Sequence, residues 1–578
     1  TYAAKAGTGT LALKTFYPNT TLTVSDTSAT LTVSGPGIRY LKWNGNVSGT
    51  WDTTTANWLL ESVASTYAEG AAVLFDDTAV GNYTVGASGS VSPSSATINN
   101  SVSNYVLSAG IAGANTVVIK TGSKNATLSG ANTYGGGTIL SGGTLSVGSS
   151  ANLPAGALMF NGGTLQITGT TLTSFDAYTV NWDSFNGGLD LASGNTFGVT
   201  NAIGGVGSLS KSGAGTLILS GTNTYGGGTT VNAGYLRVSN SQALGPGSVN
   251  MTGVDCELNL MGGLVFTNAI TVRSDGLVNS AGSLQSYYGT SNTWSGPVTL
   301  GDGNARIGAP GAVLVINGVI DSGVNAYDLI IRNPNDLGGT VVLAATNAWR
   351  GNLWIRCGTV RVGIRNAVPV TSILHLGLEG NQTGVSDSVF DLAGFDQTIA
   401  GLVDRGTDNL HVVTNSASMF STLTVNVALS SAYAYAGTLA GKLGVVKAGA
   451  GTLTLAGTNT TFGGFSVNAG TLVLSPAGTC GVNCTNIAVN AGTLTLSNSV
   501  SIADNAVLRV ANGGAAKVNL ASGVNESVGY LFFNDKQRPG GTYGATGSGA
   551  RVVDDEHFAG TGVVTVLHGN GGTVIRLL

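Results

Sequence analysis

The chain has 578 residues, including 90 glycines and 11 prolines, and its formal net charge at pH 7 is −4. Charged residues make up 9% of it and hydrophobic residues 42%, which argues against disorder, because disordered chains combine low hydrophobicity with high charge. The chain has no basic run and no apolar stretch near the roughly 20 residues of a membrane span, so we expect neither a nucleic-acid partner nor a membrane-spanning segment.

Residues 1–40 begin with a fragment of a unit that recurs later in the chain, KAGTGTLAL at Lys5–Leu13. Thr21–Ser34 alternates like a pair of strands, with a turn at Ser25–Ser28. The first residue is Thr1, and we expect it to be a mature terminus left after removal of a signal peptide.

Residues 41–115 contain an aromatic cluster formed around Trp43, Trp51 and Trp58. Two interpretations are open. The three indoles could form a platform for sugars, because flat apolar rings match the C–H faces of glycans. Alternatively, they could form the packed core of a cap, since tryptophan is usually well buried.

Residues 116–525 contain the repeated unit. Lys120–Val147 aligns without a gap with Lys211–Val238, and so does Lys447–Leu474. A degenerate copy, in which some of the repeat residues are replaced, covers Gly339–Val362. Internal repeats of this size indicate a solenoid, in which each unit has too little apolar surface to fold alone and stacks on its neighbours.

The second copy, KSGAGTLILSGTNTYGGGTTVNAGYLRV, shows how the unit would fold. Leu217 and Leu219 are two residues apart and therefore share one face of a strand. Gly226–Gly228 suits a turn, and Asn223 can bond backbone groups at a bend.

This unit resembles the autotransporter-associated β-strand repeat of bacterial secreted and surface proteins. The resemblance rests on Lys211, Gly213, Gly215, Thr216, Leu217, Leu219, Gly221, Asn223, Thr224, Tyr225, Gly227, Gly228, Thr229, Gly234 and Leu236. It implies an all-β, elongated, right-handed parallel β-helix, or β-solenoid, with β-rich caps at its ends. It also implies an exported, extracellular or cell-surface protein with a structural or adhesive role, and no catalytic site. Residues 41–115 and 526–578 resemble the segments that flank the repeats in this family.

Four cysteines bear on the compartment. Cys480 and Cys484 flank Gly-Val-Asn in an expected turn, and we predict a small-loop disulfide between them. Cys256 and Cys357 could form a second pair or remain two buried thiols, because pairing needs a closeness that the sequence does not show.

Residues 526–578 end in an apolar strand, Thr573–Leu578. Its apolar members Val574, Ile575, Leu577 and Leu578 could, with Thr573, add to the edge of a neighbouring molecule, or the strand could fold onto its own solenoid. A half repeat at one end and a strand at the other favour self-association into a homopolymer or fibre.

Enzyme motifs are missing from the sequence. The 28 acidic residues are scattered, the four histidines form no local set, and no nucleophile elbow, phosphate loop or zinc motif is present. We therefore predict a non-enzymatic structural protein without cofactor or metal, either a surface rod or a filament subunit. A carbohydrate-binding surface protein is the first alternative, and a β-helical polysaccharide-degrading enzyme is the second.

Overall fold

A computed structural model describes residues 20–25, 28–33, 40–273, 276, 282–287, 289–333, 338–377, 387–405, 411–481 and 483–569. The chain divides into two compact units, which are considered separately. Unit 1 comprises Thr1–Ile218 and Asn223–Gly227, and unit 2 comprises Leu219–Thr222 and Gly228–Leu578.

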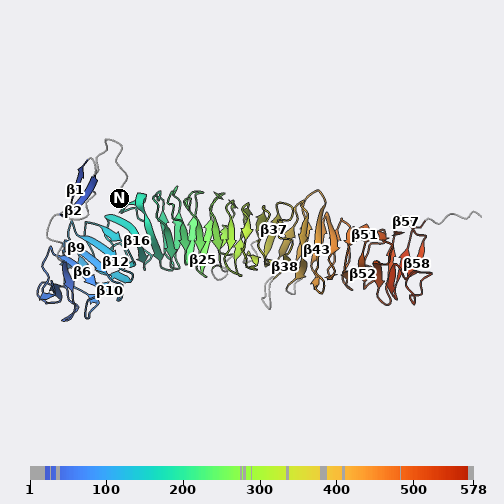
Figure 1. Ribbon diagram of the computed structural model, residues 1–578, viewed down its shortest axis with the longest axis horizontal. Coiled ribbons are helices and arrows are strands. Elements are labelled where there is room, and N and C mark those ends of the chain that lie inside the picture. Colours follow the sequence, from blue (N-terminus) through green and yellow to red (C-terminus); the bar gives the residue numbers. More distant parts are fainter. Residues whose placement is uncertain are drawn as a thin grey trace, which may run out of the picture. The chain divides into compact units, whose positions relative to one another are not determined.

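Unit 1 is a stack of coils whose strands pair in parallel with those of the next coil (Figure 1). Leu145 pairs with Leu165, so one coil here takes 165 − 145 = 20 residues. One sheet contains β3 (Tyr40–Trp43), β6 (Ala72–Asp76), β9 (Ser95–Asn99), β12 (Val117–Thr121), β14 (Thr138–Leu140), β16 (Ala157–Ile167) and β17 (Thr179–Val180). A second contains β7 (Thr84–Val85), β10 (Tyr105–Leu107), β13 (Asn125–Leu128), β15 (Thr144–Val147), the second half of β16, β18 (Asn186–Leu191) and β20 (Leu209–Ser212).

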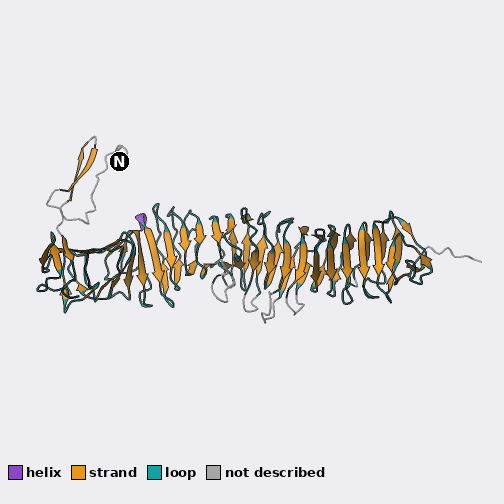
Figure 2. Cartoon of the chain, turned by 60° about the horizontal axis from the view of Figure 1, so that its bottom comes forward, coloured by secondary structure: helices purple, strands orange, loops and turns teal. Residues whose placement is uncertain are grey.

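Unit 2 is built in the same way, and Figure 2 shows its strands as successive rungs. One sheet contains β23 (Gly234–Val238), β25 (Cys256–Leu260), β28 (Leu284–Ser286), β31 (Arg306–Gly308), β34 (Leu329–Ile331), β36 (Leu353–Ile355), β38 (Ile373–Leu376) and β41 (Gly401–Asp404). Another contains β44 (Ala432–Tyr435), β47 (Thr452–Leu455), β50 (Thr471–Leu474), β52 (Gly492–Leu496), β54 (Ala516–Leu520) and β60 (Phe558–Gly560). A third sheet includes β37 (Gly358–Val362). A fourth includes β46 (Leu443–Ala448), β49 (Phe465–Val467) and β56 (Tyr530–Phe533). The predicted architecture of stacked parallel coils is confirmed.

Leucine ladders form the core of these coils. On β47, β50 and β52, Leu453 pairs with Leu472, and Leu472 pairs with Leu494. All three side chains are buried with no exposed surface. Burying a leucine stabilises a fold by about 1.5–3 kcal/mol, so a ladder ties adjacent coils together. The alternating leucines of the repeat thus face the core, as the sequence predicts.

Antiparallel strands lie at the first and last described coils. β4 (Trp58–Leu60) pairs antiparallel with β3, and β5 (Val63–Ser65) pairs with β4. Near the other end, β57 (Lys536–Gln537) pairs antiparallel with β56, and β58 (Gly541–Gly544) with β61 (Val563–Val566). Antiparallel pairs of this kind cover edges that would otherwise present unpaired backbone groups.

The predicted N-terminal hairpin is present. β1 (Thr20–Ser25) pairs antiparallel with β2 (Ser28–Val33), with Ser25 opposite Ser28. The half repeat at Lys5–Leu13 and the terminal strand at Thr573–Leu578 lie outside the described residues. The division into residues 1–40, 41–115, 116–525 and 526–578 stays a prediction, although β9 and β10 of the second segment pair directly with β12 and β13 of the third.

The repeat asparagine bridges three successive coils. The Asn459 Oδ1 atom accepts a hydrogen bond from the Leu439 N–H at 2.8 Å, one coil back, and its Nδ2 donates to the Thr479 carbonyl, one coil ahead. Asn132 does the same, accepting from the Ile111 N–H at 2.8 Å and donating to the Asn152 carbonyl at 2.6 Å. Both side chains are buried, so they satisfy backbone groups that water does not reach.

Where the repeat is degenerate or absent, other polar side chains bond to the backbone groups of neighbouring coils. Asn347 in the degenerate copy accepts a hydrogen bond from the Ile320 N–H at 2.7 Å and donates one to the Ala367 carbonyl at 2.8 Å. Further along, the fully buried Glu526 carboxylate accepts from the Ser501 and Ile502 N–H groups, at 3.0 and 2.9 Å. Burial raises the pKa of Glu526 to about 7, because desolvation penalises the ionised form more than the two N–H groups favour it.

The repeat lysine is also buried, and its ammonium group bonds to backbone carbonyls. Lys447 donates from Nζ to the carbonyls of Ala448 and Gly449, both at 2.7 Å, and to that of Ala469 on the next coil at 3.1 Å. Lys120 has the same arrangement, with the carbonyls of residues 121, 122 and 142. Burial lowers the pKa of each lysine to about 8, so both remain mostly charged at neutral pH.

A glycine in the left-handed region completes this turn. Gly449 has φ +71°, and a Cβ built on it would lie 2.2 Å from the Val427 carbonyl oxygen of the preceding coil. Gly122 and Gly213, at the same position of the other two copies, have φ +70° and +71°. The Lys-x-Gly spacing of the repeat thus combines a buried cation with a turn that brings carbonyls toward it.

We expect Asn459→Ala to lower the free energy of unfolding by about 2–4 kcal/mol, because it leaves a buried N–H and a buried carbonyl without partners. Urea-unfolding midpoints measure this loss. Asn490→Ala is the matched control, since Asn490 bonds across coils to Asn468 on the exposed surface, and its effect should stay below about 0.5 kcal/mol. Equal losses in the two variants would contradict the bridging role.

Glu526 should make stability depend on pH. Its pKa is higher in the folded chain than the usual 4.5, so the folded state binds the extra proton, and the free energy of unfolding falls as the pH rises from about 4.5 through about 7. The full loss is about 3 kcal/mol. We expect Glu526→Gln to flatten this decline between pH 5 and pH 8. The control variant Asp535→Asn changes an exposed carboxylate and should leave the decline intact. If the decline in stability were unchanged in Glu526→Gln, other titrating groups would be its cause.

Candidate functional site

The three tryptophans of the cap segment lie in the core. Trp43, Trp51 and Trp58 have no exposed surface and pack in edge contacts, with ring centroids 5.0 Å apart for the first and third and 5.4 Å for the second and third. Phe75 packs against all three. A sugar cannot reach these rings, so the glycan-platform interpretation is wrong and the alternative, a packed cap, is what the structure shows.

Cys256 and Cys357 cannot form a disulfide with each other. Cys256 begins β25, and Cys357 lies just after β36, four strands away in the same sheet order. At about 4.8 Å per strand the separation is roughly 19 Å, far more than the 7 Å limit between disulfide-bonded Cα atoms. Both residues are buried, and that possible second pair is excluded.

Cys480 and Cys484 are close together in the interior. Both are fully buried, and their thiols lie close enough for each to shift the pKa of the other. This proximity, together with burial and the nearby Glu526, raises the pKa of the Cys480 thiol. The structure records no disulfide among the cysteines, all four of which lie in described segments.

Other kinds of site find little support in the part of the chain that the structure describes. There, no three His, Cys, Asp or Glu side chains gather as metal ligands would. No described helix is both long and apolar enough to cross a membrane.

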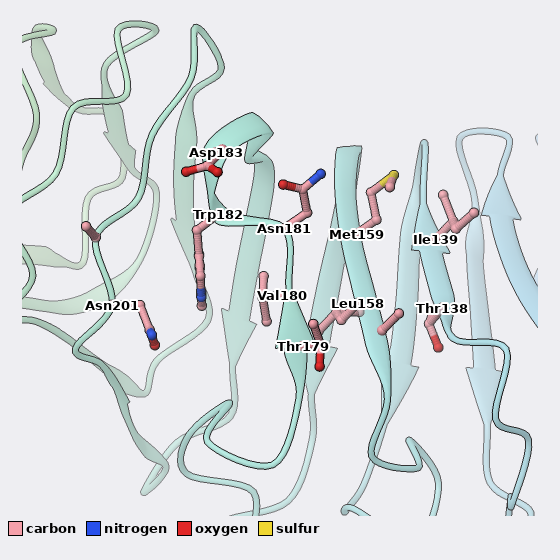
Figure 3. Close-up of a pocket in the computed structure, with 12 residues that line it drawn as sticks. Thr138, Ile139, Leu158, Met159, Thr179, Val180, Asn181, Trp182, Asp183 and Asn201 are labelled. Carbon is pink, nitrogen blue, oxygen red and sulfur yellow. The ribbon is translucent and has the colours of Figure 1, made fainter. Parts of the chain in front are cut away.

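A groove with a volume of about 570 Å³ lies on the outer surface of unit 1 (Figure 3). Its floor comes from the adjacent parallel strands β14, β16 and β17, on which Thr138 pairs with Leu158, and Leu158 with Val180. The lining residues are Thr138, Ile139, Ala157, Leu158, Met159, Thr179, Val180, Asn181, Trp182, Asp183, Asn201 and Ala202.

The groove forms where the chain leaves the sheet after β17. A single 3-10 turn, η1 (Trp182–Ser184), follows the strand and carries Trp182. The Trp182 carbonyl accepts from the Gly204 N–H at 2.8 Å, which fixes the turn to the next coil. Phe185 stacks on the indole with centroids 5.9 Å apart and an angle of 27°, and Phe175 lies 6.0 Å away.

Trp182 is partly exposed, and Figure 3 shows its ring between Val180 and Asn201. Polar side chains surround it: Asp183, Asn201 and Thr179 are exposed, and Asn181 is partly exposed. Asp183 is the one carboxylate among the lining residues, and neither lysine nor arginine lines the groove. The site therefore combines one aromatic ring, an apolar floor and a rim of neutral and acidic hydrogen-bonding groups.

Sequence reasoning missed Trp182. The predicted candidate rings, Trp43, Trp51 and Trp58, are buried, whereas Trp182 is partly exposed. The run Asn181–Asp183, Asn-Trp-Asp, places an apolar residue between two polar ones, which is also the pattern of a half-buried strand. The residues around Trp182 therefore do not distinguish it from the buried Trp43, which lies between Lys42 and Asn44.

Comparison with known proteins bears on the repeats. A family model described as the passenger-associated-transport-repeat matches residues 118–147, 209–238 and 445–474. The Adhesin BmaC autotransporter of Brucella suis biovar 1 (strain 1330) is 26% identical over 431 residues, which are 60% of this chain but only 12% of that protein. No solved structure matches the chain significantly. The repeat recognised in the sequence is therefore confirmed as the autotransporter-associated repeat, and this chain is a β-solenoid protein that carries three copies of it.

Proposed function

We propose that this chain is an extracellular part of a non-enzymatic, adhesin-like surface protein, exported as an autotransporter passenger. The observation that carries the proposal is the passenger-associated repeat, present three times with its lysine, glycine and asparagine in structural positions. The similarity to a protein named as an adhesin autotransporter supports the same conclusion.

The coil design suits a surface location. Stability comes from leucine ladders, asparagine bridges and buried lysines inside the coils, so the outer surface is free to vary. Charged residues are few, and most interactions between coils do not depend on salt-sensitive surface ion pairs. Such a scaffold holds its shape while it presents surface residues away from the cell.

The groove argues for binding rather than catalysis. Hydrolysis of a glycosidic bond generally needs two carboxylates, about 5–10 Å apart, acting as acid and as nucleophile or base. Asp183 is the one carboxylate that lines the groove of unit 1. This supports a non-enzymatic role over the polysaccharide-degrading alternative.

Self-association into a filament stays a prediction. Both segments proposed to join molecules, Lys5–Leu13 and Thr573–Leu578, lie outside the described residues. The antiparallel pairs at β4–β5 and β56–β57 cover backbone groups near the described ends. A monomeric surface protein is therefore the primary proposal.

Surface exposure can be tested on intact cells of the source organism. Antibodies raised against the purified chain should label unpermeabilised cells or detect the protein in the medium, and external protease should remove the label. A cytoplasmic protein of the same cells serves as the control for lysis. Labelling that appears only after permeabilisation would contradict the proposal.

We also propose that Cys480 and Cys484 form a disulfide after export, because their thiols lie near each other in the interior. Each thiol would lose one proton and one electron to an external oxidant as the sulfur–sulfur bond forms. Closing this five-residue loop should stabilise the chain by about 2 kcal/mol. Alkylation followed by mass spectrometry should find both residues protected in the protein isolated from the cell surface and reactive after reduction and unfolding. Two alkylated thiols without reduction in the unfolded surface protein would contradict the pairing.

A further inference from the structure

We infer that the groove around Trp182 is a binding site for neutral saccharides. The inference begins with the unused hydrogen-bonding capacity of its rim. Within the described residues, the side chains of Asn181, Asp183 and Asn201 make no hydrogen bond, and neither does the indole N–H of Trp182.

Several other asparagines of unit 1 bridge coils. Asn132, Asn152 and Asn195 are each tied to backbone groups of neighbouring coils. Asn181 and Asn201 are thus not structural bridges, although they occupy the same kind of bend. The side-chain amides of these two residues make no intramolecular bond within the described part of the chain, and they line the groove, where a ligand can reach them.

The chemistry of the groove fits a sugar ring. The ring's C–H face can lie on the Trp182 indole, which Phe185 supports from behind. An amide offers one acceptor and two donors, and each sugar hydroxyl can both donate and accept, so Asn181 and Asn201 can each bond to hydroxyl groups. The Asp183 carboxylate accepts from two neighbouring hydroxyls. The lining thus combines apolar side chains with polar groups that can fix the orientation of a ligand.

Other ligand classes fit less well. An anionic sugar, sulfate or phosphate would face Asp183 with no lysine or arginine in the lining to offset it. A quaternary ammonium group would meet one aromatic ring instead of an enclosing cage. A purely apolar ligand would strip water from the polar rim without replacing its hydrogen bonds. A neutral saccharide can both stack on the Trp182 indole and form hydrogen bonds with the polar side chains around it.

The groove also has the extent of a chain ligand. It crosses β14, β16 and β17, which are consecutive strands in one sheet, and continues to Asn201 on the following coil. Three strands span roughly 10 Å. This is longer than one six-membered ring, so a short oligosaccharide is a better match than a monosaccharide.

The test uses the purified full chain, so its result does not depend on where the protein is displayed. The folded protein is applied to an array that carries neutral oligosaccharides, acidic oligosaccharides and choline-bearing ligands, and the affinity for the strongest hit is then measured in solution. We expect neutral glycans to bind. Trp182→Ala should weaken binding at least about tenfold, and Asn201→Ala at least about threefold.

Two further variants keep the result interpretable. Trp182→Ala could disturb packing against Phe175 and Phe185, whereas Asn201 has no intramolecular side-chain bond to lose, so Asn201→Ala should keep the unfolding midpoint of the parent chain. Phe462→Ala, which removes an exposed ring from unit 2, is the control and should bind like the parent. No binding to any neutral glycan would overturn the inference, as would a preference for acidic or choline-bearing ligands or an undiminished affinity in both groove variants.

Discussion

The bends between strands impose the main constraint on this fold. In a parallel stack the strands satisfy each other's backbone groups, but at each corner the chain turns and leaves N–H and carbonyl groups inside the coil. Asn132 and Asn459 meet this requirement with one amide each, accepting from the coil before and donating to the coil after. Stacking therefore depends on corner side chains as much as on the leucine core.

Different chemistry can meet the same constraint. Gln397 accepts from the Val368 N–H at 3.0 Å and donates back to its carbonyl at 2.8 Å, with one more methylene than asparagine. Glu526 accepts from two N–H groups but has no donor when ionised, and burial raises its pKa. Each such corner therefore needs a buried polar side chain that is long enough to bond to the backbone groups of a neighbouring coil. This explains why copies of the repeat can be hundreds of residues apart while the coils between them still stack.

Much of the architecture follows from the sequence. The spacing of Leu453 and Leu455 fixes which strand face is buried, and the copies reveal that coils stack. The partner of a corner asparagine, however, lies on another coil, 20 residues away for Asn459 and Leu439. Sequence alone indicates that Asn223 bonds at a bend but not that such bonds cross coils. The distance between Cys256 and Cys357 is hidden for the same reason, since it depends on how many strands separate them.

The candidate site was not predictable in this way, because it arises where the repeat pattern stops. A ligand groove needs side chains that the coils do not use, and a strict repeat leaves few of them. After β17 the chain leaves the sheet, η1 carries the partly exposed Trp182, and the side chains of Asn181 and Asn201 line the groove. Such an interruption of the repeat is where side chains become available for binding. Functional sites in proteins of this design are therefore better sought at departures from the repeat than within it.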